Sequence, residues 1–114
     1  MVANGFCSRA QVQLGYGIGI PDPISIFVNS YGTSQICGYD DEELDNIVRR
    51  NFDLKAGRLI ETLNLRRPIF KKTTLYGHFL KTGEEFTWEC VKDLSREKKD
   101  DKPCSAFKKQ ANGN

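Results

Sequence analysis

Apolar and other residues alternate with a period of two from Arg9 to Ile20, which predicts a β-strand. One face of this strand carries the apolar side chains Ala10, Val12, Leu14, Tyr16, Ile18 and Ile20. The other face carries Arg9, Gln11, Gln13, Gly15, Gly17 and Gly19. Alternate glycines weaken a strand and suggest that another backbone or a ligand approaches closely. Pro21 and Pro23 then end the strand, because proline donates no backbone hydrogen bond.

Residues 24–31 form a second run rich in β-branched and aromatic side chains (ISIFVNSY), which predicts a second strand. The small polar residues Gly32, Thr33 and Ser34 end it. Because few residues separate the two runs, we expect the strands to pair antiparallel.

The clearest predicted helix runs from Asp40 to Phe52. Asp40 followed by Glu43 resembles a capping box. Acidic residues in the first turn and Arg49 and Arg50 in the last complement the helix dipole. Its apolar face is formed by Leu44, Ile47, Val48 and Phe52. A second helix is predicted after Asp53 as its cap, with Leu59, Ile60 and Leu63 as an apolar stripe.

The pattern from Leu65 to Glu89 is aperiodic, and Pro68, Gly77 and Gly83 interrupt it. We therefore expect an irregular segment wrapped over a core. Few large apolar residues follow Trp88, and charged residues are frequent. These features predict one folded domain over residues 1–94 and a disordered polar tail over residues 95–114.

Composition narrows the classes of function. A formal net charge of +2 gives no reason to expect a nucleic-acid partner. No apolar run approaches the roughly 20 residues that span a bilayer, so we expect no membrane association. The first residues lack the basic and apolar regions of a secretory signal, which predicts a cytoplasmic location. In that setting free thiols are favoured over two disulfides for the four cysteines.

Few residue patterns in the sequence indicate catalysis, phosphate binding or metal binding. The glycines at 15, 17 and 19 alternate within a strand, unlike the spacing of a phosphate-binding loop. The single histidine, His78, could act as an acid or base, but a hydrogen-bonded structural role is favoured. With no C-x-x-C pair, structural zinc is not expected. Residue patterns alone therefore predict a soluble domain of mixed α and β structure without an assigned function.

Several stretches, in order along the chain, resemble the C-terminal part of S-adenosylmethionine synthetases. They are QVQLGYGIG at 11–19, PISI at 23–26, YGT at 31–33, IVRRNFDLKAG at 47–57, LNLRRPIF at 63–70, YGHF at 76–79 and TWE at 87–89. The resemblance implies an α+β fold with a small, mostly antiparallel sheet and helices packed on one face. It also implies an incomplete copy of that domain, without its first elements, so the sheet should expose apolar surface.

The family enzyme forms S-adenosylmethionine from ATP and L-methionine and releases phosphate and pyrophosphate, with the help of Mg²⁺ and K⁺. The family's phosphate-binding and metal-binding motifs do not match any stretch of this chain, so the resemblance assigns no catalytic and no metal-binding residue here. ATP and L-methionine are then expected to bind only in a complete enzyme, and the chain alone should be inactive. The alternative is a non-catalytic module that docks on a full synthetase subunit.

The resemblance also assigns roles to individual residues. Ile18 matches an isoleucine that lies against the substrate in the family, although its strand pattern is also compatible with a core position. A second set resembles subunit-interface surface and predicts a homo-oligomer or a complex with a full-length subunit: Arg9, Gln11, Gln13, Phe27 and Tyr31. The chain departs from the family at Gly15, Gly17 and Leu80-Lys81, where serine, alanine and Gly-Arg are usual.

Overall fold

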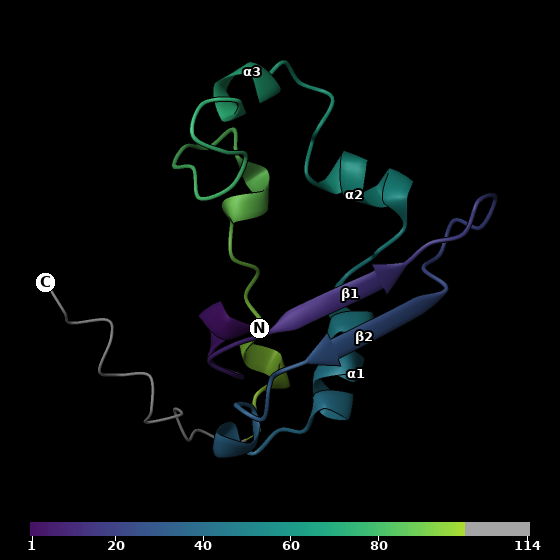
Figure 1. Ribbon diagram of the computed structural model, residues 1–114, viewed down its shortest axis with the longest axis vertical. Coiled ribbons are helices and arrows are strands. Elements are labelled where there is room, and N and C mark those ends of the chain that lie inside the picture. Colours follow the sequence, from purple (N-terminus) through teal and green to yellow (C-terminus); the bar gives the residue numbers. More distant parts are fainter. Residues whose placement is uncertain (100–114) are drawn as a thin grey trace, which may run out of the picture.

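A computed structural model describes residues 1–99 of the chain and confirms the predicted class, a small α+β domain with a two-stranded antiparallel sheet (Figure 1). The strands are β1 (Gln11–Gly15) and β2 (Ser25–Asn29), and the α-helices are α1 (Asp41–Asn51), α2 (Ala56–Thr62) and α3 (Phe70–Thr73). Short 3₁₀ turns are η1 (Val2–Asn4), η2 (Gln35–Cys37), η3 (Thr87–Glu89) and η4 (Ser95–Glu97).

The predicted antiparallel strand pair is confirmed. Its register places Val12 opposite Val28 and Gln13 opposite Phe27. Since residues directly opposite each other share a face, the apolar pairs Val12–Val28 and Leu14–Ile26 lie on one side of the sheet. Helix α1 packs on β2, and Val28 is buried there. Val12 on β1 remains 43% exposed, so this face of the sheet is only partly covered by the described residues.

The first strand is shorter than predicted, because it ends at Gly15 and does not reach Ile20. The amide of Ile20 donates to the Gly17 carbonyl at 3.2 Å, and Gly19 has a φ of +79°. A turn therefore replaces the last part of the expected strand, and glycine supplies the left-handed conformation that the turn needs. Ile18 consequently does not share a strand face with Val12 and Leu14.

Helix α1 follows its sequence signals closely. The Glu43 amide donates to the Asp40 carboxylate at 2.7 Å, and the Asp40 amide donates to the Glu43 carboxylate at 3.0 Å. This reciprocal pair is the predicted capping box, and it satisfies two N–H groups that the helix leaves unpaired. The apolar face is also confirmed, since Leu44, Ile47 and Val48 are buried.

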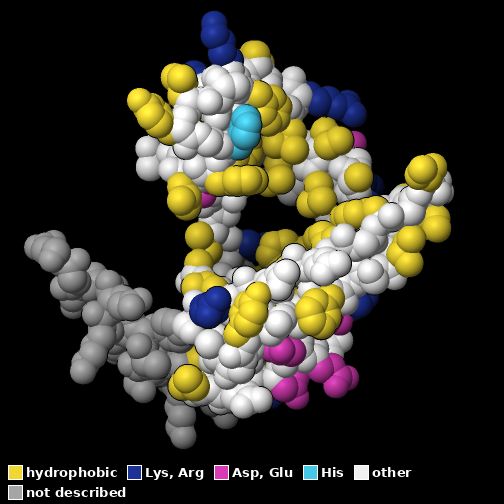
Figure 2. Space-filling model, viewed as in Figure 1, with side chains coloured by type: hydrophobic (Ala, Val, Ile, Leu, Met, Phe, Trp, Pro, Cys, Tyr) yellow, Lys and Arg dark blue, Asp and Glu magenta, His cyan; other side chains and the backbone are white. Residues whose placement is uncertain are grey.

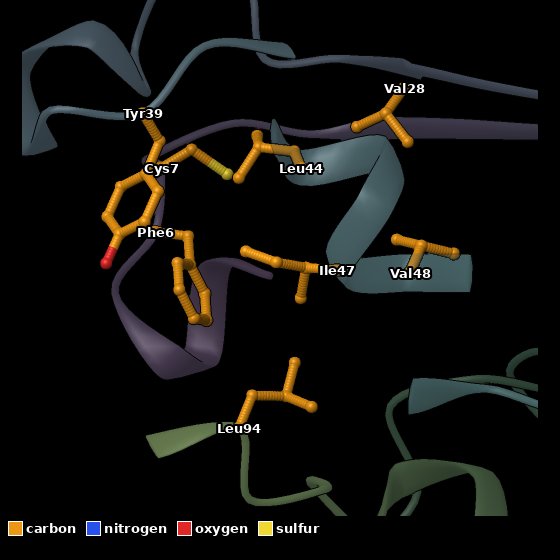
Figure 3. Packing of buried hydrophobic residues seen from close by; sticks show 8 residues of the cluster. All are labelled: Phe6, Cys7, Val28, Tyr39, Leu44, Ile47, Val48 and Leu94. Atoms are coloured by element: carbon orange, nitrogen blue, oxygen red, sulfur yellow. The ribbon is translucent and has the colours of Figure 1, made fainter. Parts of the chain in front are cut away.

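The core lies between the sheet, α1 and the two ends of the described chain (Figure 3). Phe6 and Tyr39 meet edge to face with ring centroids 5.0 Å apart. Leu94, near the end of the described residues, packs into the same cluster (Figure 3). The buried cluster consists of Phe6, Cys7, Val28, Tyr39, Leu44, Ile47, Val48 and Leu94. No residue between 49 and 93 belongs to it.

Residues 56–90, which we call the lobe, stand apart from the strand pair (Figure 1). The predicted irregular character is confirmed, but the prediction that the segment wraps over the core is wrong. Its own buried side chains, Ile69, Thr73 and Phe86, form no part of the core cluster. Helix α2 begins after Lys55 without a side-chain cap, so the predicted Asp53 cap is also wrong. The expected stripe is half-buried at best, and Ile60 is 36% exposed.

Residues 91–99, which we call the strap, return to α1 and the N-terminal turn. The Leu94 side chain is 2% exposed, and its amide donates to the Asn4 side chain at 3.0 Å. Glu97 accepts from Arg50 at 2.7 Å and from Asn51 at 2.9 Å. Residues 95–99, which begin the predicted tail, thus contact α1. Residues 100–114, the remainder of that tail, lie outside the described residues.

The cysteines only partly follow the sequence prediction. Cys7 and Cys90 carry free thiols, as expected, with Cys7 buried and Cys90 exposed. Burial raises the pKa of the Cys7 thiol, with the N-terminal ammonium opposing the effect and Asp41 adding to it. Cys37 is disulfide-bonded, so the expectation of free thiols is wrong at that position.

Candidate functional site

The turn between the strands carries the predicted substrate-contacting residue. Residues 16–24, which we call the hairpin tip, project beyond the end of the paired strands (Figure 1). Ile18 is fully exposed there, and Ile20 and Ile24 are also exposed, at 52% and 64%. Three isoleucines on one protruding turn present apolar surface that the described residues do not cover. Such surface is typical of a segment that packs against another molecule or chain.

The hairpin tip leaves little room for a side chain at Gly17. A Cβ added at Gly17 would lie 2.6 Å from the Ile24 Cδ1 atom, which is too close unless the Ile24 side chain moves. At Gly15 an added Cβ would lie 2.5 Å from the Ser25 hydroxyl. Gly15 and Gly17 therefore leave room for side chains of the opposite arm, and not for the backbone or ligand that the sequence suggested, whereas an added Cβ at Gly19 would meet nothing within 4 Å.

The five residues predicted as interface gather on one exposed region. Gln11 and Gln13 share the face of β1 that is opposite to its apolar face, and Phe27 lies directly across from Gln13. The Tyr31 hydroxyl donates to the Gln11 side chain at 2.9 Å. The Arg9 guanidinium lies 4.8 Å from the centre of the Tyr31 ring. We call this surface the sheet face, and its members are Arg9, Gln11, Gln13, Phe27 and Tyr31.

The sheet face is turned away from α1. Figure 2 shows hydrophobic and basic side chains projecting from the strand pair on the side opposite the helix. Phe27 is 56% exposed and Tyr31 is 51% exposed. Large aromatic side chains flanked by an arginine and amides match the composition of protein–protein contact surfaces. The arrangement can therefore provide an aromatic centre with a hydrogen-bonding rim.

Local backbone geometry fixes the aromatic end of the sheet face. Tyr31 has a φ of +55°, which is uncommon for a bulky residue. Its amide donates to the Asn29 side chain at 2.8 Å, which supports this conformation. The Thr33 hydroxyl accepts from the Arg9 amide at 3.3 Å and holds the start of β1 nearby. This role of Thr33 could not be predicted from the sequence, because a side-chain bond across 24 positions has no local pattern.

The structure does not bring Ile18 and the sheet face into one site. Gly15 pairs with Ser25 at the turn end of the hairpin, whereas Gln11 pairs with Asn29 at the open end. Ile18 lies beyond the turn end, and Arg9 and Tyr31 lie at the open end. The chain thus presents two separate surfaces, one apolar tip and one aromatic face.

His78 and the potential metal ligands are the remaining candidates from the sequence. Nδ1 of His78 is 2.8 Å from the hydroxyl of Thr73, which confirms a hydrogen-bonded histidine. Among residues 1–99 no three His, Cys, Asp or Glu side chains lie close enough together to hold a metal ion. Within the same range, every helix is too short or too polar to cross a bilayer. We therefore restrict the candidate site to the hairpin tip and the sheet face.

The sequence is similar to known proteins. A family model described as "S-adenosylmethionine synthetase, C-terminal domain" matches residues 1–90. The S-adenosylmethionine synthase of Brachyspira hyodysenteriae is 49% identical over 96 residues, covering 82% of this chain and 24% of that protein. The S-adenosylmethionine synthase of a Nitratiruptor species is 48% identical over 89 residues, covering 78% of this chain and 22% of that protein. The chain thus spans about a quarter of the length of these curated relatives.

Proposed function

The chain belongs to the S-adenosylmethionine synthetase family, as a copy of that family's C-terminal domain, and from this we propose that it works as part of such a transferase. The complete enzyme would form S-adenosylmethionine from ATP and L-methionine and release phosphate and pyrophosphate. The family match over residues 1–90 is the observation that carries the proposal. A cytoplasmic location accords with this role.

Ile18 is the residue of this chain that we expect to contact substrate. Its side chain is fully exposed on the protruding hairpin tip, so it can reach a ligand held mainly by other parts of the enzyme. An apolar side chain in that position excludes water and packs against apolar atoms of the substrate. This contact orients the substrate and involves no proton transfer by this chain.

The sheet face is the surface that we expect to meet another subunit. Phe27 and Tyr31 would form its buried centre, and Arg9, Gln11 and Gln13 its polar surroundings. The partner would be a second copy of the chain or a full-length synthetase subunit. No nucleic acid or membrane takes part in this proposal.

Residues 1–99 offer no group of three His, Cys, Asp or Glu side chains that could hold the Mg²⁺ that the family resemblance implies. We expect Mg²⁺ and K⁺ to bind elsewhere in the complete enzyme, and we assign no step to a metal held by this chain. We likewise propose that the chain alone does not turn over ATP and L-methionine. Coverage of only 22–24% of the curated relatives supports this view.

A chimera tests the proposal directly. The 96 matching residues of the Brachyspira synthase would be replaced by this chain, and S-adenosylmethionine formation measured beside the isolated chain. We expect activity in the chimera and none in the isolated chain. Ile18→Ala in the chimera should lower kcat/KM by up to about 60-fold, since it removes three methyl or methylene groups worth about 0.8 kcal/mol each when fully buried. Turnover by the isolated chain would refute the proposal that it is inactive alone. An unchanged kcat/KM in the Ile18→Ala chimera would refute the substrate contact of Ile18.

The second candidate function is a non-catalytic module that docks on a full synthetase subunit. The exposed aromatic sheet face favours it, because it is available for contact in this chain. Co-purification of the chain with the Brachyspira subunit, and its loss in Phe27→Glu, would support docking. No association at micromolar concentration would exclude it.

A further inference from the structure

One hydrogen bond ties the hairpin tip to the part of the chain between α1 and α2. The Tyr16 hydroxyl donates to the Leu54 carbonyl at 2.5 Å, across 38 positions of sequence. Among the described residues, no other hydrogen bond joins residues 16–24 to a segment outside the strands. Tyr16 is therefore the main polar connection between this tip and the rest of the domain.

The acceptor of this bond is held firmly. The Leu54 side chain packs against the core cluster, and the adjoining Phe52 packs there as well. The Lys55 carbonyl accepts from the Leu59 amide at 2.9 Å, which fixes the next residue as the start of α2. The Leu54 carbonyl thus sits between two anchored points, and a group bonded to it has little freedom to move.

A second, weaker contact reaches the same linker. The Asp22 carboxylate lies 3.7 Å from the Lys55 ammonium, and the two side chains are 63% and 47% exposed. Exposed ion pairs contribute little, because water and salt screen them. This pair can orient the returning arm of the hairpin, but the neutral hydrogen bond of Tyr16 is the specific one.

We propose that Tyr16 is a positioning residue that fixes the direction in which Ile18 projects. This inference rests on the proposed role of Ile18 in substrate contact. Tyr16 and Ile18 are two positions apart, and the turn between them closes through the Ile20 amide and the Gly17 carbonyl. Fixing the Tyr16 ring therefore fixes one end of the short turn that carries Ile18. An apolar contact of this kind depends on its position, so a mobile tip binds less well.

The acceptor site also connects the tip to the lobe. Residues 53–55 lead directly into α2, so a displacement of the lobe would shift the acceptor of the Tyr16 bond. The position of Ile18 is consequently linked to the placement of the lobe mainly through the Tyr16 side chain.

Nuclear magnetic resonance on the whole chain tests the positioning role. Tyr16→Phe removes only the hydroxyl, and we expect lower heteronuclear NOE values at Gly17, Ile18 and Gly19. Exchange of the hydrogen-bonded Ile20 amide should speed up by about fivefold, the factor that the loss of one net hydrogen bond gives. The matched control is Tyr76→Phe, because the fully exposed Tyr76 makes no side-chain hydrogen bond among the described residues. It should leave the tip unchanged.

The outcomes separate a positioning role from general stability. If the amides of Ile47 and Val48 lose protection as much as that of Ile20, Tyr16 supports the whole fold and the proposal is wrong. If no tip signal changes, it is wrong as well. In the chimera, Tyr16→Phe should raise the KM for the substrate whose KM Ile18→Ala raises, about threefold to tenfold, with kcat nearly unchanged. An effect of Ile18→Ala without one of Tyr16→Phe would overturn the positioning role alone, whereas an inert Ile18→Ala would overturn the substrate role.

Discussion

Glu43 takes part in two interactions, and both favour its charged form. Its carboxylate pairs with the Lys99 ammonium of the strap and accepts the backbone amide of Asp40. The Lys99 contact is the larger cause and the Asp40 amide the smaller one, and together they lower the pKa of Glu43 below its ordinary value of 4.5. A carboxylate stabilised in the folded state releases its proton more readily there than in the unfolded chain.

We therefore predict that Glu43 makes the fold sensitive to acid. Because its folded pKa is depressed, its contribution is complete above pH 4.5 and is lost as the pH falls through the folded pKa. Urea unfolding between pH 7 and pH 3 should show stability falling below pH 4.5. In Glu43→Gln, which preserves the capping box, that fall should be shallower. An identical pH profile in the two proteins would contradict the prediction.

At the scale of elements, the strap completes the core although it follows the segment that the family model matches. Leu94 is almost fully buried against residues of η1, α1 and their neighbours. Asn4 accepts from its amide and donates to the Lys92 carbonyl at 2.8 Å. The strap therefore joins the N-terminal turn to the C-terminal end of α1 by both apolar and polar contacts.

Leu94→Ala should destabilise the fold by about 2–5 kcal/mol, because it leaves a cavity that the surrounding core fills only partly. Urea unfolding monitored by circular dichroism measures the change. Leu75→Ala is the matched control, since Leu75 is 66% exposed and its truncation should cost less than about 0.5 kcal/mol. Equal effects of the two substitutions would show that the strap does not seal the core.

Local signals in the sequence predicted some elements and missed others. Helix α1 was predicted within a residue at each end because capping, dipole charges and apolar spacing all act within its own length. The end of β1 was missed because alternation continues through Ile18 and Ile20, although these residues form a turn. Residues 95–99 of the strap were assigned to a tail because their contacts with α1 are distant in sequence, as Glu97 bonds Arg50 and Asn51 across 47 and 46 positions. Local pattern carries no information about such contacts.

The candidate site was likewise predicted only in part from the sequence. The five residues of the sheet face were grouped by the family resemblance, and the strand register then places three of them, Gln11, Gln13 and Phe27, on one face. The alternation already separated Ile18 from Gln11 and Gln13, but it did not show that the strand ends at Gly15 and that Ile18 lies on an exposed turn. The bond between Tyr16 and Leu54 requires the hairpin and the α1–α2 linker to meet, which only the folded chain reveals.

At the scale of the whole molecule, the described chain is uneven in its packing. The core contains eight buried hydrophobic residues in one cluster, while the lobe buries few side chains and exposes Phe70, Leu75, Tyr76, Phe79 and Leu80. Figure 2 shows hydrophobic side chains spread over the surface of the lobe. In the complete synthetase, this surface would be available for contact with other parts of the enzyme.

The lobe should open more readily than the core. Helix α2 has seven residues and no side-chain cap, and a helix of that length depends on tertiary packing. We predict that the Leu63 amide in the lobe exchanges at least about tenfold faster than the Val48 amide in α1, as expected for a less stable local unit. Hydrogen exchange measured by nuclear magnetic resonance tests this. Equal rates with the same denaturant dependence would mean that lobe and core unfold together.

The contact between Asn4 and the strap has a consequence for how the chain acquires its structure. The two hydrogen bonds of Asn4 span 88 and 90 positions of sequence. Closing so long a loop costs conformational entropy before the apolar contacts of Leu94 are gained. Proteins dominated by such distant contacts fold slowly compared with those built from local ones. Helix α1 and the hairpin can form from neighbouring residues, whereas we expect the core around Phe6 to close late, when Leu94 meets the N-terminal turn.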